Sequence, residues 1–273
     1  MGLEVRTQAL TMPALGLGTW QMEEAEAAEA VADALALGYR HIDTAEIYGN
    51  ERGVGEGLRH GGVPRESIFV TTKVWRDHLD EGEIRRAVEA SLRRLGLDFV
   101  DLYLVHWPNP AFDLDETLSA MTKVHEEGLA RHIGVSNFPP SWLTRAVERA
   151  PIAVLQCEYH PFLDQDALLS LCRTHDLAFT AYSPLAQGRV VGDGRLARIG
   201  ARHGKTAAQV ALRWLVQQPG VSAIPKASRR AHRQANLEIF DFELSSDEMA
   251  AITALTAEEA RTVDPPWQVD WER

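Results

Sequence analysis

The chain has 273 residues, 45% hydrophobic and 25% charged, an ordinary globular balance that suits one large domain over residues 1–273. The formal net charge of −11 provides no general positive field, so we expect no nucleic-acid partner, and any bound phosphate needs a local basic site. Two cysteines, Cys157 and Cys172, are too few for a disulfide scaffold, and no apolar run approaches the roughly 20 residues of a membrane span, so we expect a cytoplasmic protein with no membrane partner.

The chain begins with residues 3–12, which resemble a short β-hairpin. Eight short apolar runs then follow at an average spacing of about 30 residues, which is the length of one strand plus one crossover helix. Most of these runs are nearly continuously apolar at their centres, as strands covered on both faces are. We predict strands at 14–20, 39–45, 67–74, 100–107, 131–137, 153–159, 178–184 and 221–227.

Helical patterns fill the gaps between these strands. Residues 25–37 are rich in Ala, Glu and Leu and stop at Gly38, which is typical of a helix ended by a left-handed glycine. Two later helices are predicted to begin with capping boxes, and these are the pairs Thr206–Gln209 and Ser245–Glu248.

Eight strand–helix alternations without a linker predict one closed (β/α)8 barrel, a TIM barrel of the α/β class, with the hairpin plugging its bottom. An open doubly wound sheet is the alternative, although it normally uses fewer strands. The C-terminal tail, TVDPPWQVDWER, carries Trp267 and Trp271. These indoles either pack on the outside of the barrel or line the mouth of a ligand pocket.

Two familiar site motifs fail. Gly16 and Gly18 suggest a dinucleotide-binding fold, but Gln21 stands where G-x-G-x-x-G requires its third glycine. His41 and Asp43 lie two apart on one strand and are able to start a metal site. No second close pair completes that site, so we expect no metal.

Four ionisable residues follow or end three neighbouring strands. They are Asp43, Tyr48, Lys73 and His106, and a barrel brings such strand ends together at one mouth. A Lys beside the Tyr hydroxyl is expected to lower the tyrosine pKa, and an Asp holds the Lys in place. A His orients the carbonyl oxygen of the substrate. The set predicts a general acid for carbonyl reduction by hydride.

At these residues the sequence resembles the aldo-keto reductase family, across nearly the whole chain. The matching motifs, in order, are GLGTW, GYRHIDTAEIYGNERGVGEGL, TTKVW, DLYLVHWP, GVSNF, LQCEYHP, YSPLAQG and IPKASRR. The resemblance implies a barrel with an N-terminal hairpin, a monomer, and an NADPH-type cofactor bound without a dinucleotide fold. It also matches Asp43, Tyr48, Lys73 and His106 to the catalytic tetrad of the family.

The resemblance assigns cofactor contacts one position at a time. Ser136, Asn137 and Gln156 match residues that bond the nicotinamide carboxamide, and Tyr182 matches the ring that stacks on the nicotinamide. The matches on the pyrophosphate side are Ser183 and Leu185, and Asn236 matches an adenine contact.

The 2′-phosphate of NADPH needs a local positive site. Residues 224–236 follow the eighth strand and open a helix, whose free N–H groups favour an anion. The basic residues there are Lys226, Arg229, Arg230 and Arg233, and the expected ligands are Lys226, Ser228 and Arg229. The family often has Ser and Arg where this chain has Ala227 and His232. We therefore expect NADPH, with NADH accepted by a smaller margin.

Three indoles are expected to form the substrate pocket around His106. Trp20, Trp75 and Trp107 follow strands one, three and four, at positions that the family uses as pocket walls. A narrow apolar slot with polar chemistry at its base suits small aldehydes, α-ketoaldehydes and keto-sugars such as 2,5-diketo-D-gluconate. Within the family, the sequence most resembles bacterial 2,5-diketo-D-gluconate and methylglyoxal reductases.

The leading hypothesis is thus an NADPH-dependent alcohol:NADP+ oxidoreductase (EC 1.1.1.-) with Tyr48 as general acid. One alternative is a nucleotide-sensing regulatory barrel with little turnover. Another is a metal-dependent barrel hydrolase or isomerase that uses His41, Asp43 and His106.

Overall fold

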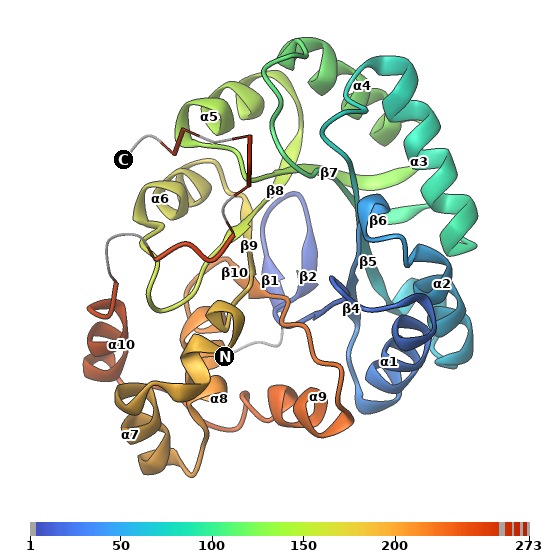
Figure 1. Ribbon diagram of the computed structural model, residues 1–273. Helices are drawn as coiled ribbons and strands as arrows, with labels where there is room; N and C mark the ends of the chain where they lie inside the picture. Colours follow the sequence, from blue (N-terminus) through green and yellow to red (C-terminus); the bar gives the residue numbers. More distant parts are fainter. Residues whose placement is uncertain (1–3, 257–259, 264, 268–269, 272–273) are drawn as a thin grey trace.

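The computed structural model describes residues 4–256, 260–263, 265–267 and 270–271. Eight parallel strands form one sheet, in the order β10-β9-β8-β7-β6-β5-β4-β3. Their bounds are β3 (Leu17–Gly18), β4 (His41–Asp43), β5 (Phe69–Val74), β6 (Val100–Val105), β7 (Ala130–Ser136), β8 (Ile152–Glu158), β9 (Ala178–Tyr182) and β10 (Val221–Ala223). The sheet curls into a ring with helices around it (Figure 1).

The ring is closed by contacts between its first and last strands. The Gly16 N–H donates to the Ala223 carbonyl, and the Ala223 N–H donates to the Ala14 carbonyl, both at 2.9 Å. The fold is therefore the predicted (β/α)8 barrel, and the open sheet is wrong. These closing contacts also explain why β3 has two residues instead of the seven expected for residues 14–20. The other residues of that run pair with the last strand through isolated bridges, such as Leu15 with Ala223.

Helices cover the outside of the barrel. They are α1 (Glu24–Leu37), α2 (Glu51–His60), α3 (Glu81–Leu95), α4 (Leu114–Glu126), α5 (Pro140–Arg149), α6 (Asp166–Thr174), α7 (Gly194–His203), α8 (Ala207–Val216), α9 (Arg230–Leu237) and α10 (Ser246–Thr253), with 3-10 turns η1 (Glu46–Tyr48), η2 (Arg65–Ser67) and η3 (Ala186–Gly192). α1 ends at Gly38 with φ 113°, as predicted. Both predicted capping boxes are present.

The predicted N-terminal hairpin plugs one end of the barrel. β1 (Glu4–Arg6) and β2 (Thr11–Pro13) pair antiparallel. Val5 and Met12 belong to one buried cluster with Phe69 and Ala178, the first residues of β5 and β9. The hairpin thus seals the N-terminal ends of the strands, and the chemistry is left to the opposite end.

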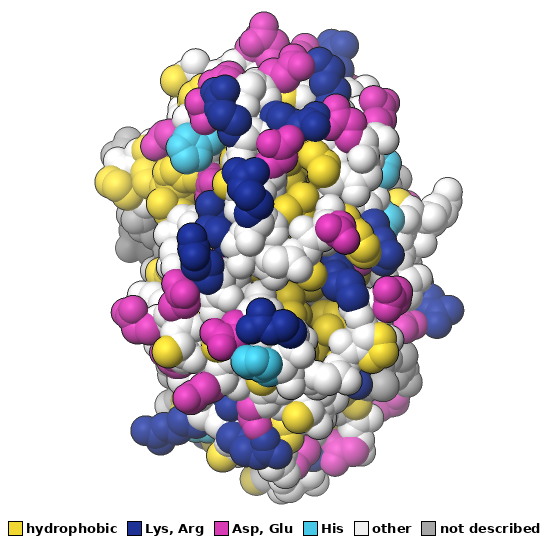
Figure 2. Space-filling model, turned by 90° about the vertical axis from the view of Figure 1, so that its right-hand side faces the viewer, with side chains coloured by type: hydrophobic (Ala, Val, Ile, Leu, Met, Phe, Trp, Pro, Cys, Tyr) yellow, Lys and Arg dark blue, Asp and Glu magenta, His cyan; other side chains and the backbone are white. Residues whose placement is uncertain are grey.

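The helices separate an apolar inner face from a charged outer face. α3 buries Ile84 and Val88 against the sheet, while Arg85 on its outside pairs with Glu89. Figure 2 shows Lys and Arg side chains interspersed with Asp and Glu on this side of the molecule. Within the described ranges, no helix combines the length and the apolar character that crossing a membrane requires.

α1 and α2 pack so closely that glycine is required between them. A Cβ on Gly53 would lie 1.9 Å from the carbonyl oxygen of Glu24, and one on Gly57 would lie 2.6 Å from that of Ala28. These two glycines lie four apart on one face of α2. Because η1 precedes α2 directly, this packing also fixes where Tyr48 lies.

Candidate active site

A cavity of about 540 Å³ opens at the C-terminal ends of the strands. Asp43, Tyr48 and His106 line it, and Lys73 lies behind them with its side chain fully buried. Asp43 ends β4, Lys73 is one residue from the end of β5, and His106 follows β6. The structure therefore brings the four expected catalytic residues to one place.

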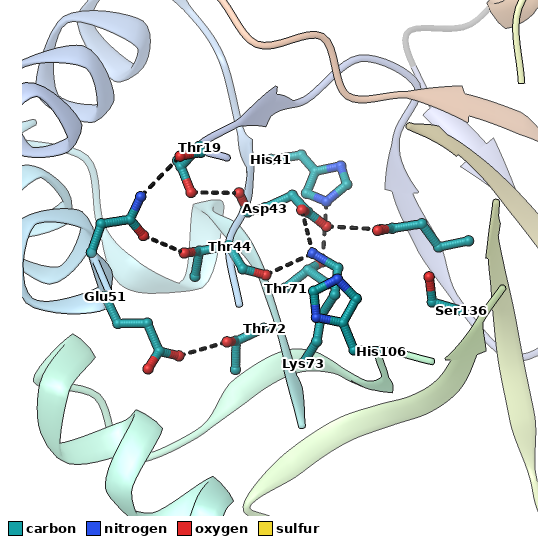
Figure 3. A network of polar contacts seen from close by, with 12 residues as sticks. Thr19, His41, Asp43, Thr44, Glu51, Thr71, Thr72, Lys73, His106 and Ser136 are labelled. Atoms are coloured by element: carbon teal, nitrogen blue, oxygen red, sulfur yellow. Dashed lines mark hydrogen bonds and ion pairs between the residues drawn. The ribbon is translucent and has the colours of Figure 1, made fainter. Parts of the chain in front are cut away.

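Lys73 is bound by a carboxylate and a carbonyl (Figure 3). Its Nζ donates to Asp43 Oδ1 at 2.5 Å and to the Thr44 carbonyl at 2.7 Å. The other oxygen of Asp43 accepts from Gln156 Nε2 at 2.8 Å. Burial lowers the pKa of Lys73 and the charge of Asp43 opposes that shift. The ammonium is thus held in a fixed position, 5.2 Å from the centroid of the Tyr48 ring.

The predicted lowering of the Tyr48 pKa is wrong. Burial, and then the charge of Asp43, hold the pKa of Tyr48 well above its ordinary value of 10.0. The positive charge of Lys73 is partly offset by the carboxylate that it contacts, so its effect on the phenol is smaller than that of burial. Tyr48 therefore keeps its proton at neutral pH, which is the form that a proton donor needs.

His106 lies edge-on between two other rings. Its centroid lies 5.6 Å from that of Tyr48 and 5.4 Å from that of Trp75. Its backbone is fixed, because its N–H donates to the Val74 carbonyl at 3.0 Å and its carbonyl accepts from Asn137 Nδ2 at 3.0 Å. Burial, and then the charge of Lys73, hold its pKa well below 6.5. The ring is neutral at pH 7 and has one N–H to donate.

Asn50 holds the loop that carries Tyr48. This buried side chain donates to the carbonyls of Thr19 and Met22 at 2.9 and 3.0 Å, and its oxygen accepts from Thr44 Oγ1 at 2.9 Å. Thr44 is the residue whose carbonyl binds Lys73. Sequence reasoning missed this residue, since an Asn before a helix is read locally as an N-cap, whereas its partners lie up to 31 residues away.

Amide side chains form one wall of the cavity. Asn137 and Gln156 line it together with Tyr182, and the buried Ser136 lies beside them. The Tyr182 hydroxyl donates to Asn137 Oδ1 at 2.7 Å, and Asn137 Nδ2 contacts Ser136 Oγ at 3.0 Å. Amides next to an aromatic ring suit a flat heterocycle that carries a carboxamide, so these residues fit the nicotinamide end of the expected cofactor.

The residues expected to contact the remainder of the cofactor lie further out. Ser183 lines the cavity with φ 46°, in the left-handed region, and Leu185 comes just before η3. Asn236, the expected adenine contact, is buried on α9, one turn beyond Arg233, whose carbonyl accepts from the Tyr39 hydroxyl at 2.9 Å.

The basic side chains of residues 226–233 do not all face the same partner. Arg233 is buried and pairs with Asp33 of α1 at 2.7 Å, and Arg230 pairs with the same carboxylate. These two arginines, which were not among the expected phosphate ligands, are therefore engaged by α1. Ser228 and Arg229 are exposed at the start of α9, where no side chain caps the helix, and Lys226 lines the cavity.

The three predicted indoles line the cavity, and the tail adds a fourth. Trp20, Trp75 and Trp107 are joined by Trp267, whose ring lies 5.6 Å from both Trp75 and Trp107. Of the two positions that the sequence left open for this indole, the pocket mouth is correct. Ile47, exposed on η1, completes the rim.

The described residues do not form the other candidate sites, a metal site or a reactive cysteine. Within the described ranges, no three His, Cys, Asp or Glu side chains gather as a metal site requires. His41 contacts Thr71 instead, at 3.1 Å. Cys157 and Cys172 are free and buried, and burial raises the pKa of both thiols, which makes both poor nucleophiles.

Comparisons with known proteins agree with this site. The model of the "Aldo/keto reductase family" matches residues 14–257. A 9,11-endoperoxide prostaglandin H2 reductase from Trypanosoma cruzi is 43% identical over 94% of this chain and 92% of its own. A methylglyoxal reductase from Yersinia pestis is 43% identical over 93% and 92%. A crystal structure of a candidate 2,5-diketo-D-gluconic acid reductase B superposes with a TM-score of 0.95 at 44% identity, covering 97% of this chain and 95% of the other.

Proposed function

The chain belongs to the aldo/keto reductase family, and we propose that it is an NADPH-dependent reductase of small aldehydes and ketones with Tyr48 as the proton donor. The observation that carries the proposal is the Asp43–Lys73 ion pair beneath Tyr48 and His106, at the base of a cavity walled by indoles. A protonated phenol and a neutral imidazole that line one cavity supply the proton and the hydrogen bond that a carbonyl oxygen needs.

Each of the four residues has a role in proton delivery. His106 holds the carbonyl oxygen of the substrate, and Tyr48 gives it a proton as negative charge develops there. Lys73, 5.2 Å from the tyrosine ring, stabilises the phenolate that remains, and Asp43 fixes the Lys73 ammonium. When bound, the dihydronicotinamide supplies the hydride that reduces the carbonyl carbon.

The residues that would hold the cofactor run from one side of the cavity out to the start of α9. Ser136, Asn137 and Gln156 would bond the carboxamide, and Tyr182 would stack on the nicotinamide ring. The pyrophosphate and adenosine contacts are Ser183, Leu185 and Asn236. Lys226, Ser228 and Arg229 hold the 2′-phosphate, supported by the uncapped N-terminus of α9.

The ratio of kcat/KM with NADPH to kcat/KM with NADH tests that phosphate site. Arg230 and Arg233 are occupied by Asp33, so only two cations remain for the phosphate. We expect a kcat/KM preference for NADPH below about a thousandfold, roughly 4 kcal/mol. A larger preference in a direct comparison of the two cofactors contradicts this assignment.

We propose small α-ketoaldehydes and keto-sugars as substrates, in particular methylglyoxal and 2,5-diketo-D-gluconate. The narrow cavity with four indole walls favours small or flat carbonyl compounds. Relatives named methylglyoxal reductase and glyoxal reductase, both 43% identical, support this class. A carbonyl panel with both cofactors tests it, and it fails if none of these compounds is reduced.

A nucleotide-sensing barrel with little turnover is the second candidate. Tight NADPH binding without reduction of any carbonyl in that panel favours it. Running the panel in EDTA also tests the metal-dependent alternative, because only that alternative loses activity in the chelator. We further propose that the protein acts as a cytoplasmic monomer, which size-exclusion chromatography with light scattering checks for the oligomeric state.

A further inference from the structure

A buried carboxylate of the barrel accepts several hydrogen bonds from the C-terminal tail, whose backbone carbonyls also accept from Gln187 and Arg189 of η3. Glu158 ends β8, and its side chain is fully buried. It accepts hydrogen bonds from the Thr262 N–H at 2.7 Å, from the Thr262 hydroxyl and from the Val263 N–H at 3.2 Å. Three donors of the tail therefore converge on one side chain that lies 104 residues earlier in the chain.

The barrel supplies a fourth donor. Nε2 of the buried His160 lies 3.2 Å from Glu158 Oε1, and Nδ1 of the same ring accepts from the Phe162 N–H at 3.3 Å. A neutral imidazole with its proton on Nε2 satisfies both contacts. Burial alone would raise the pKa of Glu158, but the hydrogen bonds from His160 and Thr262 outweigh it and lower that pKa. The carboxylate is therefore charged at neutral pH.

The tail enters the cavity immediately beyond this contact. Val263, Pro265 and Trp267 line the cavity, and the Trp267 ring packs edge-on against Trp75 and Trp107. Arg76 lies 4.5 Å from the centroid of the Trp267 ring. The fourth indole wall thus depends on where the tail is held.

We propose that Glu158 is a positioning residue for substrate selectivity, which docks the tail so that Trp267 closes the outer part of the substrate pocket. A buried charge that loses its donors is costly, so the carboxylate selects one docked arrangement of the tail. The inference rests on the proposed reductase function, because selectivity is read through turnover. The outer wall matters most for a substrate long enough to reach it.

Glu158→Gln tests the proposal with two substrates of different length. We expect the KM for 4-nitrobenzaldehyde to rise about tenfold, the scale of a lost apolar wall contact. The KM for methylglyoxal, kcat for both substrates and the Kd of NADPH should stay within about threefold, since proton delivery is untouched. An equal rise of both KM values, or no rise, overturns the proposal.

Asp101→Asn is the matched control. Asp101 is another buried carboxylate, near the start of β6 at the opposite end of the barrel, and it accepts from the Val70 N–H at 2.9 Å and pairs with Arg65 at 2.7 Å. This variant should lose stability without any change in the ratio of the two KM values. A shift of that ratio in Asp101→Asn overturns the proposal, because general loosening then accounts for the effect.

A second readout does not depend on activity. Trypsin cuts after Arg261 to release residues 262–273, and in the docked tail the N–H of that peptide bond is hydrogen-bonded to Glu158. We expect release to be about tenfold faster in Glu158→Gln, because proteolysis follows the population of the open form. Thr262→Val, which changes only the tail, should accelerate it at least about twofold. An unchanged rate in either variant overturns the proposal, even if no carbonyl compound is ever reduced.

A double-mutant cycle shows whether Glu158 acts through Trp267. If it does, adding Glu158→Gln to Trp267→Ala should leave the KM for 4-nitrobenzaldehyde where Trp267→Ala alone puts it. Independent effects that multiply overturn the proposal. If wild-type protein shows no turnover while the tryptic result holds, the proposed function has failed but the docking contact stands.

Discussion

In the proposed mechanism, Tyr48 and Lys73 act through their positions more than through a lowered tyrosine pKa. The ammonium of Lys73 is neutralised by Asp43 at 2.5 Å, so burial dominates and Tyr48 stays protonated. An alkoxide that develops on the substrate is a much stronger base than a phenolate, so a raised tyrosine pKa does not prevent proton transfer. In the proposed mechanism the charge of Lys73 favours the phenolate, but by less than burial disfavours it, so the net pKa stays raised.

This arrangement predicts a flat pH profile for carbonyl reduction. Tyr48 loses its proton only as the pH rises through a pKa well above 10.0, and His106 gains one only well below pH 6.5. We therefore expect kcat with NADPH and methylglyoxal to change by less than about twofold between pH 7 and pH 9. A descending limb centred below pH 9 contradicts the raised Tyr48 pKa.

His41 links stability to pH. Burial lowers its pKa from 6.5 to about 4, so the unfolded chain takes up this proton first as the pH falls. Stability is thus lost between pH 6.5 and pH 4, and His41 accounts for about 2 kcal/mol between pH 7 and pH 5. Urea unfolding of wild type and His41→Gln at several pH values measures the difference in slope. Identical slopes contradict the prediction.

At the scale of elements, the close packing of α1 and α2 sets the position of Tyr48, the proposed proton donor. A methyl group on Gly53 would meet the backbone oxygen of Glu24 at 1.9 Å, so one helix has to move. Gly53→Ala should cost about 1 to 3 kcal/mol in unfolding free energy, the usual cost of overpacking, and should also lower kcat by displacing Tyr48.

Gly82→Ala is the control for this prediction. It also lies within a helix, but its added Cβ meets nothing closer than Asp80 Oδ1 at 3.4 Å. Alanine is the better helix former, so this variant should keep or gain stability, by up to about 1 kcal/mol, with unchanged kcat. Equal losses in the two variants contradict the steric account.

Local sequence patterns predicted most of the helices and strands. The spacing of apolar runs predicted eight strands, and the pair Thr206–Gln209 predicted the first turn of α8, because helix caps and strand periodicity are properties of neighbouring residues. The four proposed catalytic residues were predicted to lie together because a barrel places strand ends together, and the structure brings them to one cavity. Interactions between residues far apart in the sequence were not predicted. Asp33 binds Arg233 across 200 residues of sequence, and no local pattern announces such a partner.

At the scale of the whole molecule, one end of the barrel is closed by packing and the other end carries the candidate active site. The hairpin packs under the barrel, and the cavity opens at the opposite end. The net charge of −11 remains compatible with an anionic cofactor because Lys226 and Arg229 lie beside the uncapped start of α9. The tail completes the cavity from outside the strand–helix repeat, which is why the repeat itself did not predict its docking.

Reduction of methylglyoxal by wild-type protein and by Tyr48→Phe, followed as NADPH oxidation in EDTA, tests the central claim most directly. The account predicts turnover by the wild type and a loss of kcat of about a hundredfold to ten-thousandfold in the variant, the usual contribution of a general acid. The Kd of NADPH should stay within about threefold, since the hydroxyl is not among the cofactor contacts. Near-normal turnover in Tyr48→Phe would contradict the assignment of Tyr48 as the acid.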